Sequence, residues 1–136
     1  RPQLLDTPSG RVIIGVVDFD ADIAGDRRRM GTLRQVDETD FQEVLDNSTV
    51  PVLVDFFAEW CPPCKKLGPT LEALAEDLGD RLTIVKVNVD KSNLAGQFGV
   101  MNIPTMIIFR GGQEVKRLVG NQAKSALEKV LEPYLA

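Results

Sequence analysis

Two cysteines separated by two prolines are the side chains of this sequence best suited to chemistry. Cys61 and Cys64 are the only cysteines among the 136 residues, and they stand in the run Trp60-Cys61-Pro62-Pro63-Cys64. At this spacing the second thiol can reach the first once the chain turns into a helix. The chemistry to expect is thiol–disulfide exchange, in which a thiolate attacks a disulfide sulfur.

A structural disulfide and half of a metal site are the alternative roles for this pair. A disulfide that closes so short a loop restrains the unfolded chain little and is a poor staple. A zinc site needs further donors, and the sequence contains no histidine. We therefore expect no metal and favour a redox role for the pair.

The elements on either side of the cysteines must position them. The run 50–57 is nearly continuous apolar, which is typical of a strand buried on both faces. Residues 62–78 carry leucines at helical spacing, so Cys61 stands at a helix start. Unpaired N–H groups and a partial positive charge at that point stabilise a thiolate, and a CxxC pair beside a βαβ pattern is typical of redox sites. Pro62 and Pro63 suit the first turn of a helix.

The remaining elements alternate helices with strands. The form Thr39-x-x-Gln42 is that of a capping box and predicts a helix that runs through Leu45. Asp90 is placed to cap a short helix that runs toward Phe98. A last helix is expected from one apolar face, which consists of Ala126, Leu127, Val130, Leu131 and Tyr134.

The order of elements predicts an α/β fold with a central, mixed and mostly parallel sheet. Strands separated by helices form parallel pairs with right-handed crossovers, which puts helices on both faces. Gly111-Gly112 is a hairpin signal, so the last two strands form an antiparallel C-terminal hairpin. The expected strands are 33–36, 50–57, 82–89, 105–109 and 114–119.

Residues 32–136 resemble a complete member of the thioredoxin family. The run 54–65, Val-Asp-Phe-Phe-Ala-Glu-Trp-Cys-Pro-Pro-Cys-Lys, is similar to the family's active-site strand and helix start. Ile103-Pro104-Thr105 is similar to its cis-proline loop, and Val119-Gly120 to the glycine segment of its substrate groove. The resemblance implies the thioredoxin fold and a protein-disulfide reductase activity.

The resemblance also implies the roles of four catalytic residues. Cys61 would attack a substrate disulfide, and Cys64, expected to be the less exposed thiol, would resolve the mixed disulfide. Asp55 matches the buried carboxylate that assists deprotonation of the resolving thiol, and Lys86 matches the lysine near it. Burial in an apolar strand predicts a raised pKa for Asp55, which suits a general base near neutral pH. Substrate-binding positions implied in the same way are Trp60, Pro62, Pro63, Ile103, Pro104, which would be cis, and Gly120.

Three positions depart from the commonest family pattern. Pro62 stands where glycine is usual, Phe57 where a second tryptophan is usual, and Asn102 where glycine is frequent. Two alternative functions stay open, a more oxidising disulfide catalyst and a non-catalytic peptide-binding module of the same fold. The stretch 64–104 has no room for the insertions frequent in oxidising relatives, and the intact cysteine pair argues against the module.

Bulk properties limit the partners. The formal charge of -4 argues against nucleic acid, and no apolar run approaches membrane-spanning length. The start of the chain lacks the apolar region of a secretory signal, so a cytoplasmic location is expected. A monomer is expected as well. The partners implied are disulfide-containing proteins and a thioredoxin reductase that delivers electrons from NADPH. No bound cofactor is expected besides the redox-active disulfide between Cys61 and Cys64.

The chain is expected to divide near Met30-Gly31. Residues 1–31 are interpreted as an N-terminal extension, with an apolar run at 12–17 that can form an extra strand, followed by a linker. Its run Asp18-x-Asp20-x-Asp22 lacks the glycine and the final glutamate of a calcium loop, so no calcium site is expected. Residues 32–136 are the expected thioredoxin domain.

Overall fold

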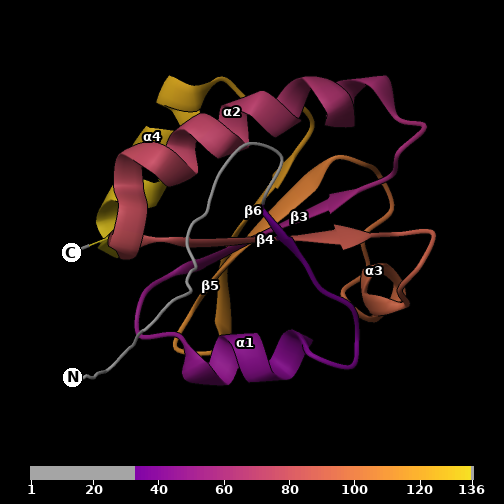
Figure 1. Cartoon of the computed structure of the whole chain (residues 1–136), viewed down its shortest axis with the longest axis horizontal. Helices are drawn as coiled ribbons and strands as arrows, with labels where there is room; N and C mark the ends of the chain where they lie inside the picture. The colour runs from indigo at the N-terminus through magenta and orange to yellow at the C-terminus, as the bar shows by residue number, and fades with distance from the viewer. Residues whose placement is uncertain (1–32, 136) are drawn as a thin grey trace, which may run out of the picture. The chain divides into compact units, whose positions relative to one another are not determined.

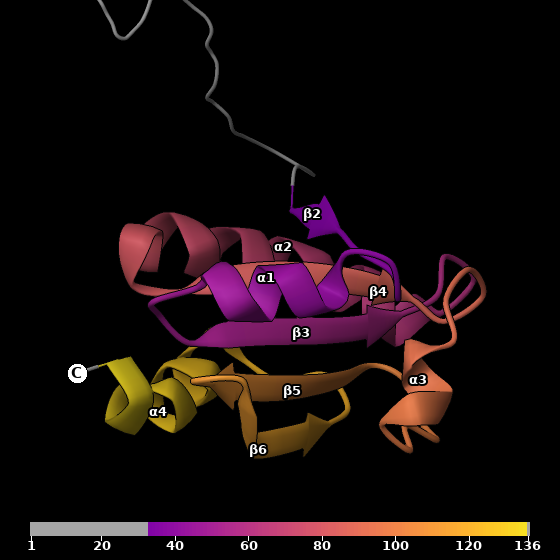
Figure 2. The same ribbon diagram turned by 90° about the horizontal axis from the view of Figure 1, so that it is seen from below.

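A five-stranded mixed sheet lies at the centre of the part of the chain that the computed structural model describes, residues 33–135. The expected extra strand and linker, within residues 1–31, lie outside this part. In sheet order the strands are β2 (Arg34–Gln35), β4 (Thr83–Asn88), β3 (Val52–Phe57), β5 (Thr105–Arg110) and β6 (Gln113–Val119). Strands β2, β4 and β3 are parallel, whereas β5 is antiparallel to β3 and β6 to β5 (Figure 2).

Strand β3 is the middle strand of the sheet, and every one of its side chains is buried. Successive side chains point to opposite faces of a sheet, so the strand supplies two cores. Val52, Val54 and Phe56 pack into one core, and Leu53 packs into the other. The continuous apolar run of the sequence therefore predicted the strand correctly, since a central strand covered on both faces needs no polar alternation.

Helices cover both faces of the sheet, as Figure 1 shows. Helices α1 (Phe41–Asn47) and α3 (Leu94–Gln97) pack on one face, and α2 (Pro62–Leu78) and α4 (Lys124–Leu135) on the other. A short 3-10 turn, η2 (Gly79–Arg81), follows α2. The α/β fold class inferred from the sequence is confirmed.

The leucines of α2 fix the helix to the sheet. Leu67, Leu71 and Leu74 are fully buried and Leu78 nearly so, with Leu127 and Leu131 of α4 in the same core. Burial of a leucine side chain contributes roughly 2 kcal/mol. The helix continues past Pro69 and keeps its first turn, which holds the cysteines, at the end of β3.

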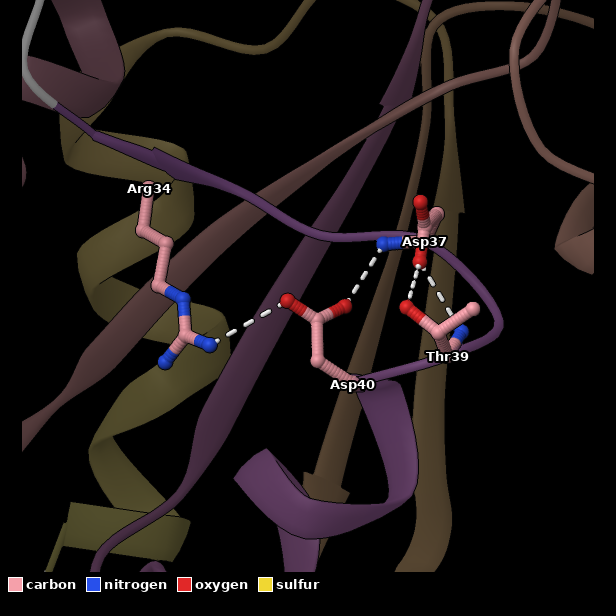
Figure 3. A network of polar contacts seen from close by, with 4 residues as sticks. All are labelled: Arg34, Asp37, Thr39 and Asp40. Atoms are coloured by element: carbon pink, nitrogen blue, oxygen red, sulfur yellow. Dashed lines mark hydrogen bonds and ion pairs between the residues drawn. The ribbon is translucent and has the colours of Figure 1, made fainter.

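The start of α1 differs from the expected capping box. The N-cap residue is Asp40, and no side chain caps the helix. Instead the Asp37 carboxylate accepts hydrogen bonds from the backbone N–H and the hydroxyl of Thr39, at 2.9 and 2.6 Å (Figure 3). Asp40 accepts from the backbone of Asp37 and pairs with Arg34. The hydroxyl of Thr39 donates to a carboxylate, a charge-assisted and therefore stronger bond than a neutral cap.

The start of α3 also differs from the prediction. Asn93, not Asp90, is its N-cap residue, and the hydroxyl of Ser92 accepts a hydrogen bond from the backbone of Leu94. The carboxylate of Asp90 accepts a hydrogen bond from the indole of Trp60 instead. The residue expected to cap a helix therefore binds the side chain that precedes the cysteine pair.

The hairpin between β5 and β6 turns at Gly111 and Gly112, as predicted. Both have a positive φ, 61° and 80°, a backbone conformation that side chains with a Cβ rarely adopt. None of the described helices is long and apolar enough to cross a membrane.

Candidate active site

Cys61 caps the N-terminus of α2. Its φ and ψ of -94° and 110° are those of extended backbone, and its Sγ accepts a hydrogen bond from the backbone N–H of Cys64 at 3.4 Å. Pro62 and Pro63 have no N–H, so Cys64 provides the first amide donor of the helix. The helix start therefore directs its first N–H at the sulfur of Cys61, where a thiolate would carry its charge.

The two thiols differ in their hydrogen bonds rather than in their exposure. Cys61 is 3% exposed and Cys64 5%, so the expectation that Cys64 is the less exposed thiol was wrong. The reason is that Cys61 lies under the loop that contains Ile103, with its Sγ 4.0 Å from the Ile103 carbonyl oxygen. Burial, together with the hydrogen bond to Cys61, raises the pKa of Cys64 to about 12. Cys64 therefore needs a base to become a nucleophile at neutral pH.

Asp55 is a buried carboxylate without a hydrogen-bond partner among the described residues. It is 1% exposed, and neither carboxylate oxygen has a partner. Burial raises its pKa to about 7, and the positive charge of Lys86 opposes that rise. The raised pKa agrees with the expectation from the apolar context of β3. The negative charge of Asp55 also contributes, as a smaller cause, to the raised pKa of Cys64, which places the two groups within electrostatic reach.

Lys86 lies beside Asp55 on the neighbouring strand. The parallel register of β3 and β4 makes the two residues partners, and their side chains share the face that α2 covers. The Lys86 Nζ lies 4.2 Å from the centre of the Phe57 ring. The lysine named from the sequence is therefore brought to the buried carboxylate, together with an aromatic ring that was not named as a functional residue.

Two loops meet at the cysteine pair. The Ile103–Pro104 peptide bond is cis, as expected. The carbonyl oxygen of Pro104 accepts a hydrogen bond of 2.7 Å from the backbone N–H of Gly120, which has a φ of 94°. The structure thus brings Ile103, Pro104 and Gly120 together at the C-terminal end of β3, next to Cys61.

Apolar side chains are exposed around the cysteine pair. Among the described residues the exposed large apolar side chains are Trp60, Met101 and Val119, at 66%, 91% and 56%. Trp60 precedes Cys61, Met101 leads into the cis-proline loop, and Val119 precedes Gly120. Sequence reasoning named Trp60 but missed the other two. Their position next to the motif residues was the signal that could have identified them.

The indole of Trp60 is held in place by a residue that follows β4. Its Nε1 donates a hydrogen bond of 2.8 Å to the Asp90 carboxylate. Pro62 and Pro63, which follow Cys61, are exposed as Trp60 is. The described residues contain no group of three or more Cys, Asp or Glu side chains able to hold a metal ion.

This arrangement is suited to two-electron exchange between thiols and a disulfide. One sulfur receives the N–H of a helix start, a second thiol lies within reach of the first, and a buried carboxylate titrates near neutral pH. Exposed tryptophan and methionine side chains such as Trp60 and Met101 are typical of surfaces that bind other proteins.

Comparisons with known proteins agree with this chemistry. The family model named Thioredoxin matches residues 32–133. The thioredoxin of Alicyclobacillus acidocaldarius is 46% identical over 99 residues, which is 72% of this chain and 93% of that protein. The bifunctional thioredoxin reductase/thioredoxin of Mycobacterium leprae is 48% identical over 97 residues, 71% of this chain and 21% of that protein. The solved structure of a mutant thioredoxin from Halobacterium salinarum is 36% identical with a TM-score of 0.70, covering 76% of this chain and 90% of its own.

Proposed function

The chain belongs to the thioredoxin family and is a thiol–disulfide oxidoreductase that reduces protein disulfides, and from this premise we propose that Cys61 attacks the substrate and Cys64 resolves the intermediate. The observation that supports this assignment is the hydrogen bond from the Cys64 N–H to the Cys61 Sγ at the start of α2. That N–H stabilises negative charge on Cys61 alone. The two sulfur atoms carry both electrons, so the exchange needs no bound cofactor.

In the first step the Cys61 thiolate attacks one sulfur of a substrate disulfide. The substrate S–S bond breaks, a mixed disulfide between Cys61 and the substrate forms, and the departing substrate thiolate takes up a proton from water. Attack at this position is supported by the place of Cys61 between the helix start and the Ile103 carbonyl, at the apolar rim.

In the second step Cys64 attacks the sulfur of Cys61. The Cys64 thiol gives its proton to the Asp55 carboxylate, the mixed disulfide breaks, and the second substrate thiolate leaves and is protonated. The products are a Cys61–Cys64 disulfide and a reduced substrate. A base is needed because burial raises the pKa of Cys64 to about 12, whereas Asp55, with a pKa of about 7, is part ionised at neutral pH.

We propose that the substrate lies as an extended segment across the rim of the site. The proposed contacts are those named from the sequence, Trp60, Pro62, Pro63, Ile103, Pro104 and Gly120, together with Met101 and Val119. Exposed apolar side chains next to the motif residues support this surface, because a substrate that covers them removes apolar area from water.

Replacement of Met101 by serine is expected to weaken substrate binding. Met101 is 91% exposed, so the change leaves the core untouched and removes apolar contact area only from the bound state. We expect KM for a protein disulfide substrate to rise about threefold with kcat nearly unchanged, a loss of less than about 1 kcal/mol. Steady-state kinetics measure both constants. The matched control is Gln113→Ser, exposed at the start of β6 beside the hairpin turn; an equal KM for wild type and Met101→Ser would exclude Met101 from the surface.

We also propose that electrons reach the dithiol from NADPH through a thioredoxin reductase. The Mycobacterium leprae relative, named as a bifunctional reductase and thioredoxin, supports this pairing. Such a supply suits a reducing compartment, which supports the proposal that the protein is cytoplasmic. We propose that it is a monomer, since one chain contributes every residue of the proposed site. The division into an extension, 1–31, and a thioredoxin domain, 32–136, remains a proposal that the match of the family model to residues 32–133 supports.

The Cys64→Ser variant tests the order of the two cysteines. Without the resolving thiol the mixed disulfide should persist, so incubation with insulin, whose disulfides are intact, should yield a covalent adduct on Cys61. Mass spectrometry of the digested adduct identifies the bonded cysteine. Dithiothreitol should reduce the mixed disulfide and release insulin from the variant. The control is Cys61→Ser, which should form no more than a trace of adduct through Cys64. A stronger adduct through Cys64 than through Cys61 would reverse the assignment.

A further inference from the structure

The ring of Phe57 lies against the ammonium group of Lys86. Phe57 is 7% exposed and packs with Ala58, Cys61 and Cys64, and the Lys86 Nζ lies 4.2 Å from its centre. This distance is within the range in which the face of an aromatic ring attracts a cation. The contact joins the lysine to the cluster that contains both cysteines.

The strand register explains why the lysine leans toward this ring. Lys86 is the register partner of Asp55, and Phe57 follows Asp55 by two positions on the same face of β3. The Lys86 side chain is therefore extended along the strand toward a diagonal neighbour. It makes no hydrogen bond to Asp55, since neither oxygen of that carboxylate has a partner.

Among the described residues, few charged groups act on Asp55. Strand β4 presents Lys86, helix α2 presents the Cys64 thiol, and strand β5 presents the uncharged Met106 as the register partner of Asp55. Lys86 is the charge that counteracts the effect of burial on the Asp55 pKa. The position of one ammonium group therefore matters for the protonation of the carboxylate.

Without an attractive surface, a half-buried lysine turns its ammonium group toward water. Lysine side chains commonly lay their methylenes along apolar surface while the charge stays solvated. In bulk water the charge would act on Asp55 through a high dielectric constant and would be screened by salt. The ring of Phe57 offers the ammonium group a position on the protein side instead.

We propose that Phe57 is a positioning residue, whose ring holds the Lys86 ammonium group near Asp55 and so sets the pH range in which Asp55 accepts the proton of Cys64. The inference rests on the proposed role of Asp55 as the base. It gives a role to one of the three departures from the usual family pattern, the phenylalanine at position 57.

A double-mutant cycle on the reduced protein tests the proposal. The variants are Phe57→Leu, Lys86→Met and the pair together, with Phe57→Tyr as the control that keeps the ring. The first readout is the pH titration of the Asp55 carboxyl carbon by NMR. The second is the pH dependence of resolution of a mixed disulfide, followed after rapid mixing of the variant with a disulfide peptide that carries a fluorescence quencher.

The expected result is an upward shift of the Asp55 midpoint in Phe57→Leu, by about half a pH unit. Lys86→Met should shift the midpoint further in the same direction, and the double variant should match Lys86→Met. Phe57→Tyr should titrate as the wild type does. A ring that acted only through packing would shift the midpoint in the Lys86→Met background as well.

Three results would overturn the proposal: an unchanged midpoint in Phe57→Leu, a lower midpoint, or a shift of equal size with and without Lys86. A lower midpoint would mean that the ring keeps the lysine away from Asp55. If the Asp55 titration shifts as expected but the rate of resolution does not follow it, the role of Phe57 in placing the lysine stands and the role of Asp55 as base fails. The two proposals can therefore fail separately.

Discussion

The Cys61→Ser variant is expected to lose protein-disulfide reductase turnover by a factor on the order of 10³ or more. A serine hydroxyl at this position cannot form a stable sulfur–sulfur bond with the substrate, so the first step has no nucleophile. The fold should survive, because serine is a good N-cap residue. Its hydroxyl oxygen can accept the hydrogen bond that the Cys64 N–H donates to the Cys61 Sγ in the wild type. Loss of activity would then report on chemistry and not on unfolding.

The measurement is NADPH oxidation in the presence of a thioredoxin reductase, with insulin as the disulfide substrate. The wild type must turn over in the same assay, which also tests the proposed electron supply. Glu59→Gln is a suitable control, because Glu59 is exposed, precedes Trp60 and has no assigned role. Circular dichroism of each variant checks the fold. Turnover of Cys61→Ser close to that of the wild type would refute the mechanism.

The position of the dithiol could be predicted because local patterns determine it. An unbroken apolar run predicted β3, and leucines at helical spacing predicted α2 from Pro62 to Leu78, the bounds that the structure shows. The cysteines fall at the junction, so their place at a helix start follows from the order of two strong signals. Such signals are reliable because an element that packs against its neighbours needs apolar side chains at many positions, which produces a long pattern in the sequence.

Helix starts were less predictable because several side chains compete for the same donors. Thr39 and Gln42 have the capping-box form, but the Thr39 hydroxyl donates its hydrogen bond to the Asp37 carboxylate. Asp90 precedes α3 at a plausible capping distance, but the indole of Trp60, which belongs to another part of the sequence, donates to it. A sequence pattern records which groups can bond locally, whereas the partner from another element appears only after folding.

The contact between Phe57 and Lys86 had no sequence signal at all. It depends on the register of β3 against β4, and a shift of one residue would point Lys86 to the opposite face. Asp55 itself was predictable, because a carboxylate in a buried run is unusual enough to suggest a function. The environment that sets its pKa was predictable only in part. Burial followed from the strand and the nearby Lys86 from the family resemblance, but the contact of Lys86 with the Phe57 ring did not.

Asp55→Asn is expected to change how the free energy of unfolding depends on pH. The pKa of Asp55 is about 7 in the folded protein, against 3.8 for the carboxyl in an unfolded chain. Between these values the folded state holds a proton that the unfolded state has released, so the contribution of Asp55 to stability falls as the pH rises through this window and is constant above it. The difference in pKa corresponds to a loss of roughly 4 kcal/mol above about pH 8.

Urea unfolding of the reduced wild type and of Asp55→Asn between about pH 4 and pH 9 measures this effect. The free energy of unfolding of the variant, relative to that of the wild type, should rise by roughly 4 kcal/mol between about pH 4 and pH 8. The buried amide of the variant also has a cost in stability, but that cost does not depend on pH. The control is Asp80→Asn, at an exposed carboxylate of η2, whose free energy of unfolding should depend on pH as that of the wild type does. A constant difference between wild type and Asp55→Asn would show that the folded protein does not raise the Asp55 pKa.

The same substitution should slow the resolving step, and this outcome links stability to catalysis. The variant lacks the proposed base for Cys64, so release of substrate from the mixed disulfide should slow about 100-fold at about pH 8. The wild-type rate should rise with pH through about 7 as Asp55 ionises, and Asp55→Asn should lack that rise. Stopped-flow measurement of substrate release gives both. If the rate of the variant kept the wild-type pH profile, another group would be the base, and the destabilising carboxylate of β3 would lack its proposed catalytic function.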